Sequence, residues 1–143
     1  MTIIKVTSLA LFACSAGWLL SSCSHLDTSP PGADRVLTGT VTSRAVVELP
    51  PNAEVTVRIV DLSLGVSRPD VLAEQTISGP TTMPVPFRIE YRADDAQLMR
   101  SVAVEARISI DGRLRYITKT AHPLTLSNVN DPHSIDVEPA GKH

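Results

Sequence analysis

The amino-acid sequence predicts an all-β fold, a small antiparallel β-sandwich of about seven strands. Three observations lead to this prediction. Valine, isoleucine and threonine recur with a period of two, which places apolar side chains on one face of a strand. Proline, glycine and asparagine separate these segments as turn residues do. Beyond residue 22 the only cysteine is Cys23, so aliphatic packing rather than a disulfide must stabilise the fold.

Each element follows from its local pattern. The clearest alternation lies in "AEVTVRIV" (53–60), "FRIEY" (87–91) and "VAVEARISI" (102–110). Further predicted strands are Val36–Val47, Val71–Ile77, Leu114–Thr120 and Ser134–Val137. The segment "DDAQLMR" (94–100) predicts one helical turn, because either Asp94 or Asp95 is a suitable N-cap.

The hairpin at "SIDGRL" (109–114) has two candidate registers. A two-residue Asp-Gly turn would place Ile108 opposite Arg115, so an apolar face would meet a basic one. A three-residue loop, with Gly112 left-handed at a bulge, would place Ile108 opposite Leu114 and Ala106 opposite Tyr116. Because the hydrophobic pattern sets the register, we predict the three-residue loop.

The N-terminus predicts a lipoprotein signal peptide. Lys5 precedes "VTSLALFACSAGWLL", an uncharged segment that is too short for a typical membrane-spanning helix. The following "LSSC" resembles the bacterial lipobox, which implies cleavage between Ser22 and Cys23 and lipidation of the Cys23 sulfur. Cys14 is a poorer acceptor, because the bulky Phe12 stands where a small residue is preferred. A plain secretory signal with an unmodified cysteine is the alternative.

The domain organisation follows from this signal. We expect a signal peptide over 1–22, the lipidated Cys23 with a flexible tether over 23–35, the β-sandwich over 36–139 and a tail over 140–143. In enterobacterial lipoproteins an aspartate after the cysteine favours the inner membrane. Ser24 occupies that position here, so by similarity we expect the outer membrane, with the domain on the periplasmic side.

Six segments in order resemble the YbaY/YscW family of Gram-negative envelope lipoproteins: "LTGTVTSR", "LPPNAEVTVRIVDLSL", "LAEQTI", "PVPFRIEY", "ARISIDGRLRYIT" and "HPL". The resemblance spans Leu37–Leu124 and implies a small β-sandwich. YscW-like members are pilotins, lipoprotein chaperones that bind a type III secretion secretin and carry it to the outer membrane. YbaY-like members are poorly characterised and are linked to envelope or polysaccharide metabolism. Two of the segments look closer to the YbaY branch, and the family has no compact motif from which partner-binding residues can be transferred.

Residues that could carry chemistry are few. His122 and His133 lie on predicted loops and, with Asp131, could in principle surround a metal, but their spacing matches no ligand pattern. We expect both histidines to be solvated and no metal or cofactor to be bound. The carboxylates of Asp94 and Asp95 are better explained by a helix start than by acid–base catalysis. Neither a nucleophile elbow nor a glycine-rich phosphate loop is present, so we expect no enzymatic activity.

Charge excludes nucleic acid as a partner. Removal of the signal takes away only Lys5, so the mature chain keeps 12 basic and 15 acidic residues, a net charge of −3. The run of Arg113, Arg115 and Lys119 is expected to be a solvated face; contact with an anionic lipid or an acidic partner is the alternative.

Together these observations predict an interaction protein of the outer membrane. We expect a chaperone that acts on a secretin or another envelope protein, and binding of a small ligand, lipid or glycan is the alternative function. A β-sandwich can bind through an open strand edge or through an apolar groove. Pro84 and Pro86 in "MPVPF" should make the start of the strand near Phe87 a poor docking edge, because proline cannot donate to a ladder.

Overall fold

A computed structural model describes residues 27–28, 32–45 and 48–141, and the all-β class is confirmed. Each of the seven predicted segments contains a strand. The elements are β1 (Asp27–Thr28), β2 (Arg35–Ser43), β3 (Ala53–Asp61), β4 (Asp70–Ser78), β5 (Val85–Tyr91), α1 (Asp95–Leu98), β6 (Val102–Ile110), β7 (Arg113–Ile117), β8 (His122–Pro123) and β9 (His133–Pro139).

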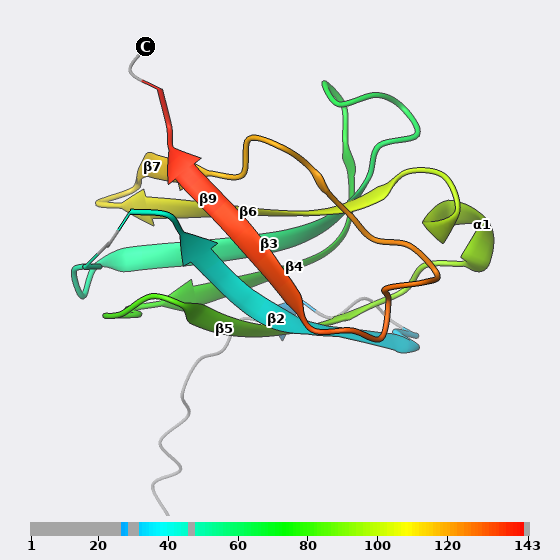
Figure 1. The fold of residues 1–143 in the computed structure, drawn as a ribbon, viewed down its shortest axis with the longest axis horizontal. Helices are drawn as coiled ribbons and strands as arrows, with labels where there is room; N and C mark the ends of the chain where they lie inside the picture. Colours follow the sequence, from blue (N-terminus) through cyan, green and yellow to red (C-terminus); the bar gives the residue numbers. More distant parts are fainter. Residues whose placement is uncertain (1–26, 29–31, 46–47, 142–143) are drawn as a thin grey trace, which may run out of the picture.

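The strands form one path, in the order β1-β4-β3-β6-β7-β9-β2-β5, with β8 pairing to β6 beside it. Figure 1 shows β2 and β9 crossing over β3, β4 and β6, so the sheet folds back on itself into two facing layers. The pairs are antiparallel except for β2 and β9, which run parallel with Gly39 opposite His133. β9 therefore joins the layers, because it also pairs antiparallel with β7.

β5, at one end of this path, comes beside β4, which is followed only by the two-residue β1 at the other end, so the sheet nearly closes into a barrel. The side-chain Oε1 of Gln75 on β4 accepts a hydrogen bond of 3.0 Å from the backbone N–H of Arg88 on β5. Two residues of β1 pair with the same strand, Asp27 opposite Gln75 and Thr28 opposite Glu74. The segment expected to be only a tether thus contributes a short strand.

β5 is an end strand, and its one proline, Pro86, suits that position. The carbonyl of Tyr91 accepts from the N–H of Asp34 beside β2, whereas the N–H of Arg88 points to β4. Since successive residues of a strand alternate in the direction of their backbone groups, Pro86 faces away from β2, where its missing N–H breaks no ladder bond. This agrees with the predicted blunting of this edge.

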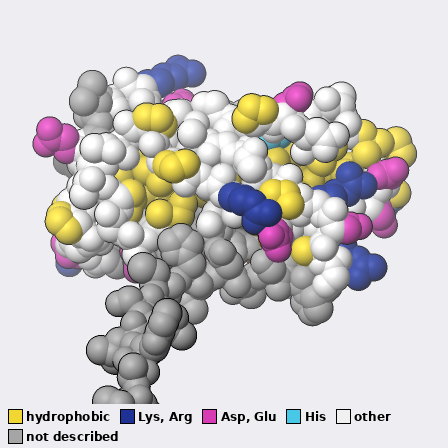
Figure 2. Space-filling view, turned by 90° about the horizontal axis from the view of Figure 1, so that it is seen from below, with side chains coloured by type: hydrophobic (Ala, Val, Ile, Leu, Met, Phe, Trp, Pro, Cys, Tyr) yellow, Lys and Arg dark blue, Asp and Glu magenta, His cyan; other side chains and the backbone are white. Residues whose placement is uncertain are grey.

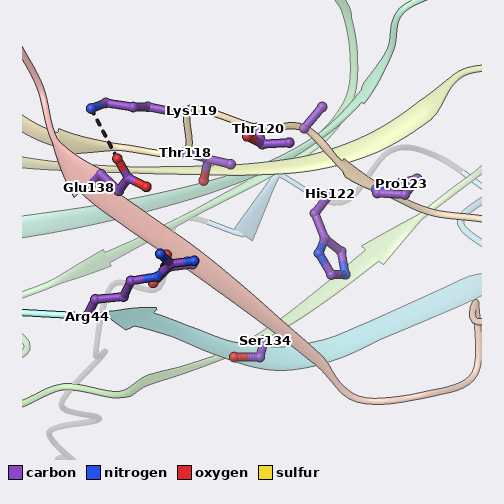
Figure 3. A pocket seen from close by; sticks show the side chains of 10 residues that line it. Arg44, Thr118, Lys119, Thr120, His122, Pro123, Ser134 and Glu138 are labelled. Atoms are coloured by element: carbon purple, nitrogen blue, oxygen red, sulfur yellow. Dashed lines mark ion pairs between the residues drawn. The ribbon is translucent and has the colours of Figure 1, made fainter.

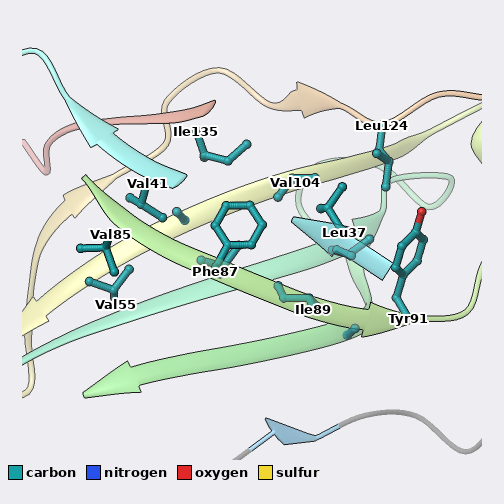
Figure 4. Close-up of a cluster of buried hydrophobic side chains, with 14 of the residues drawn as sticks. Leu37, Val41, Val55, Val85, Phe87, Ile89, Tyr91, Val104, Leu124 and Ile135 are labelled. Atoms are coloured by element: carbon teal, nitrogen blue, oxygen red, sulfur yellow. The ribbon is translucent and has the colours of Figure 1, made fainter. Parts of the chain in front are cut away.

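The core lies between the two layers and is almost entirely aliphatic. Leu37 and Val41 of β2, Val55 of β3, Val104 of β6 and Ile135 of β9 are completely buried, as Figure 4 shows from within. Tyr91 is also completely buried, and burial raises the pKa of its phenol. Its hydroxyl has no hydrogen-bond partner among the described residues, so packing of the ring, not the hydroxyl, stabilises this position.

The predicted three-residue hairpin loop is wrong. Ile110 pairs with Arg113, so Asp111 and Gly112 form a two-residue turn, and both have positive φ, 54° and 69°. A two-residue turn was expected to place the apolar Ile108 opposite the basic Arg115, and a β-bulge prevents this pairing. The register shifts between Ile108 and Ser109, leaving Arg115 as the extra residue of β7 and placing Ile108 opposite Tyr116.

The helical turn forms where it was predicted, and Asp94 rather than Asp95 is its N-cap. Asp94 accepts a hydrogen bond of 2.7 Å from the N–H of Gln97, whose side chain accepts in return from the N–H of Asp94 at 3.0 Å. Asp95 forms an ion pair of 2.6 Å with Arg35 of β2. α1 is therefore attached to the start of β2.

Candidate partner-binding surface

The predicted lipidation and cleavage residues, Ser22 and Cys23, lie outside the described residues, so Cys23 stays a prediction. In the described part of the chain, α1 is the only α-helix, and it is not long and apolar enough to cross a membrane. β1 begins four residues after Cys23. An extended chain reaches at most about 3.6 Å per residue, so the Cα of Cys23 can lie no farther than about 14 Å from that of Asp27.

Exposed hydrophobic side chains gather at the end of the barrel that carries α1. Leu64 and Val66, in the β3–β4 loop, are 74% and 79% exposed, and Met99, which follows α1, is 69% exposed. In Figure 2 the same end of the molecule shows hydrophobic side chains among charges of both signs. We call the following residues the apolar end: Val36, Leu64, Val66, Val71, Met99 and Leu126.

The pairings of the strands place these residues at the same end of the barrel. Val71 lies at the start of β4, next to the β3–β4 loop. Val36 pairs with Glu90 near the end of β5, just before α1. Leu126 follows Leu124, whose N–H donates to Val102 at the start of β6. Of the large hydrophobic residues that are exposed in the described chain, only Leu114 lies at the opposite end, beside the β6–β7 turn.

A buried carboxylate holds the apolar end in shape. Asp61, 9% exposed, accepts hydrogen bonds at Oδ1 from the N–H and hydroxyl of Ser63 and from the hydroxyl of Ser101, and at Oδ2 from the amide of Gln97. These bonds, with those of Ser63 first, lower the pKa of Asp61 to about 2. The N–H of Leu62 also donates to the carbonyl of Ser101 at 2.9 Å. The β3–β4 loop is thus tied to the end of α1, which fixes Leu64 relative to Met99.

His122 and His133 are not solvated loop residues, so that expectation is wrong. They lie on β8 and β9, and His133 is only 5% exposed. His133 Nε2 is 2.9 Å from the carbonyl oxygen of Asn128, which can only accept, so Nε2 carries the proton. In the neutral ring Nδ1 then accepts from His122 Nε2, also 2.9 Å away. Burial and then the neighbouring His133 lower the pKa of His122, which favours the neutral form of the His122 ring.

The structure does not assemble the candidate metal site. Asp131 is exposed, and the described chain contains no cluster of three or more histidine, cysteine, aspartate or glutamate side chains that could hold a metal ion. Asp94 and Asp95 do not act as a pair of carboxylates: Asp94 caps α1, and Asp95 forms the ion pair with Arg35. The geometry of these groups therefore supports structural roles.

A polar cleft of about 340 Å³ opens between the segment 118–123 and β9 (Figure 3). Lys119 pairs with Glu138 at 3.1 Å, and Arg44 pairs with Asp136 at 3.3 Å. Lys119 of the predicted basic run is thus paired across the cleft, whereas Arg113 and Arg115 are exposed on β7.

Sequence reasoning missed the apolar end and the Asp61 site. One local signal was present, because "DLSLGVSRPD" places Leu64 and Val66 in a segment whose Gly65 and Pro69 indicate a loop, where apolar side chains are not expected to be buried in a strand. Nothing local indicates that this loop lies beside Met99, since Ser63 and Ser101 are 38 residues apart in the chain.

The chain is similar in sequence to known proteins. Residues 33–137 match the sequence profile of the type III secretion system lipoprotein chaperone family YscW. The uncharacterized lipoprotein YbaY of Escherichia coli K12 is 32% identical over 89 residues, which are 62% of this chain and 47% of that protein, so the chain spans about half the length of this relative.

A solved structure also matches. The alternative pilotin from the type II secretion system of Vibrio cholerae is similar with a TM-score of 0.63 and 30% identity, over 76% of this chain and 98% of the other. The family profile covers well over half of the chain, including eight of the nine strands of the described residues, at least in part. The chain therefore belongs to the YscW family of lipoprotein chaperones.

Proposed function

We propose that the protein is a non-enzymatic lipoprotein, anchored by acyl chains on Cys23 to the periplasmic face of the outer membrane, and that it chaperones a secretin. The family and the similarity to a pilotin support a chaperone. The secretin is the partner that the pilotin resemblance implies. The short reach from Cys23 to β1 would hold the domain close to the bilayer, where an outer-membrane channel assembles.

One observation carries the partner-binding part of the proposal, namely the gathering of exposed hydrophobic residues at the apolar end. A hydrophobic patch on a solvent-exposed surface is typical of a protein–protein contact. The flexible side chain of Met99 can adapt to varied partners. The hydrogen bonds to Asp61 already order the β3–β4 loop, so binding costs less conformational entropy there. We propose that an apolar segment of the secretin docks here.

Replacement of Cys23 by alanine is expected to move nearly all of the protein from the membrane fraction to the soluble periplasm. Each acyl methylene contributes about 0.8 kcal/mol, and two or three chains together bind a bilayer firmly. Cell fractionation followed by immunoblotting measures the change. Cys14→Ala is the matched control and should leave the protein in the membrane. Unchanged membrane attachment of Cys23→Ala would refute the anchor.

The apolar end is tested by the double variant Leu64→Asp/Met99→Asp. We expect at least about 30-fold weaker binding of the secretin, because central apolar contacts contribute about 2 kcal/mol or more. Stability should change little, since both side chains are exposed. Co-purification from solubilised outer membranes and a titration with the purified secretin measure the effect. Leu114→Asp, at the opposite end, is the control; equal loss in control and double variant would contradict the assigned surface.

A further inference from the structure

The cleft of Figure 3 is a place where the sheet separates into two branches. β7 pairs with β9 only at Tyr116 opposite Pro139 and Ile117 opposite Glu138. After Ile117, the segment 118–123 stays beside β6 and leaves β9. The N–H of Thr118 donates to the carbonyl of Ala106 of β6, and β8 then pairs with β6. Toward its N-terminus, β9 instead follows β2. A wedge of about 340 Å³ therefore separates two strand-like segments.

The backbone of β9 presents hydrogen-bonding groups to this wedge. The N–H of Ala140 donates to the carbonyl of Arg115 on the β7 side at 2.8 Å. Because backbone groups alternate along a strand, those of Glu138, Asp136 and Ser134 point to the same side. Glu138 pairs with Ile117 of β7. No strand of the described residues pairs with Ser134 or Asp136 on the side of β9 that faces the wedge. An unpaired edge of this kind is a template for another strand.

The wedge is closed at both ends. The β7–β9 pairing bounds one end, and the hydrogen bond between His122 and His133 bounds the other. The open stretch between them covers residues 134–137 of β9, which at about 3.3 Å per residue matches a strand of three or four residues.

The side chains of the wedge select an uncharged occupant. Both cations, Arg44 and Lys119, are paired with carboxylates, so the wedge offers no unbalanced charge for an anion. Thr118, Thr120 and Ser134 also line the wedge, and Ala121 and Pro123 are the only apolar residues of its lining, a composition that does not suit an acyl chain. A peptide backbone with small polar side chains matches both the edge and the lining.

We propose that this wedge binds a short extended segment of the partner protein, added as a strand between β9 and the segment 118–123. The inference rests on the proposed function, since the segment is taken to belong to the same secretin that docks at the apolar end. It adds a second contact of different chemistry, in which backbone hydrogen bonds to Ser134 and Asp136 replace apolar burial.

The probe is a set of overlapping 12-residue peptides that cover the whole periplasmic sequence of the secretin from the same genome. Each peptide is added to the lipidated protein in nanodiscs, and backbone hydrogen exchange is followed by mass spectrometry with residue-level fragmentation. We expect one peptide to slow exchange at Ser134 and Asp136 at least 10-fold. Thr120→Trp fills the wedge and should remove this protection, whereas Ser127→Trp, an exposed hydroxyl residue outside the wedge, should retain it.

The outcomes separate this inference from the proposed function. Peptide binding without protection at Ser134 and Asp136, or binding unchanged by Thr120→Trp, would overturn the strand site. If no peptide binds while the intact secretin still binds through the apolar end, the strand site is wrong and the proposed function stands. If the intact secretin does not bind either, both fail.

Discussion

Replacement of Gly39 by alanine is expected to prevent the domain from folding. A Cβ at this position of β2 would overlap the carbonyl oxygen of His133 and would lie 2.9 Å from the carbonyl carbon of His133 and 2.8 Å from Cζ of Phe87. The first obstacle is backbone of β9, which cannot move away without breaking the parallel β2–β9 pairing that joins the two layers. We expect a loss of at least about 4 kcal/mol, a large part of the stability of a domain of this size.

Urea unfolding followed by circular dichroism measures this loss. Gly141→Ala is the matched control, because a Cβ there meets no atom within 4 Å and the backbone is not left-handed. Its free energy of unfolding should stay within about 0.5 kcal/mol of the wild type. A Gly39→Ala protein that unfolds at the wild-type urea concentration would show that β2 and β9 are not held at this distance.

Replacement of Asp61 by asparagine is expected to lower the free energy of unfolding by about 2 kcal/mol at pH 7. The pKa of Asp61 falls from 3.8 to about 2 in the folded protein, and each unit corresponds to about 1.4 kcal/mol. Since the folded pKa is depressed, this stabilisation is present above about pH 4 and is lost as the pH falls toward 2. The wild type and the variant should therefore differ at pH 7 and converge near pH 2.

Denaturant unfolding across this pH range measures the difference. Asp131→Asn, at an exposed aspartate, is the control and should follow the wild type. Because Asp61 ties the β3–β4 loop to Ser101, Asp61→Asn should also speed hydrogen exchange in residues 62–69. A variant as stable as the wild type at pH 7 would contradict the assigned role of the carboxylate.

Local patterns in the sequence were sufficient for the seven longer strands and the helix, but not for the two-residue strands β1 and β8. The alternation of residues 53–60 and 102–110 predicts β3 and β6, because each strand buries one face regardless of which strand lies beside it. "DDAQLMR" predicts the helical turn and its N-cap as Asp94 or Asp95, since the bonds of the observed cap join residues only three apart. Pro86 indicates an edge for the same reason: the missing N–H is a property of the residue itself.

The hairpin shows where local reasoning ended. The requirement that Ile108 avoid Arg115 was correct, yet two devices satisfy it, a longer loop or a bulge. The structure uses the bulge: Asp111 and Gly112, both with positive φ, form a two-residue turn, and Asn52, 59 residues away in the chain, donates a hydrogen bond to Asp111. Such a contact has no trace in the pattern of a single hairpin.

Local sequence patterns established the β-rich domain and predicted a lipoprotein signal peptide before it, and the ordered segments indicated the family. Only the tertiary structure decided that β9 runs parallel to β2, that His133 is buried against His122, and that Leu64 and Met99 share one end of the barrel. The physical reason is the separation along the chain between the residues that interact. Periodicity, capping and turn preference arise between residues a few positions apart, whereas a binding surface depends on which distant strands meet and in which register.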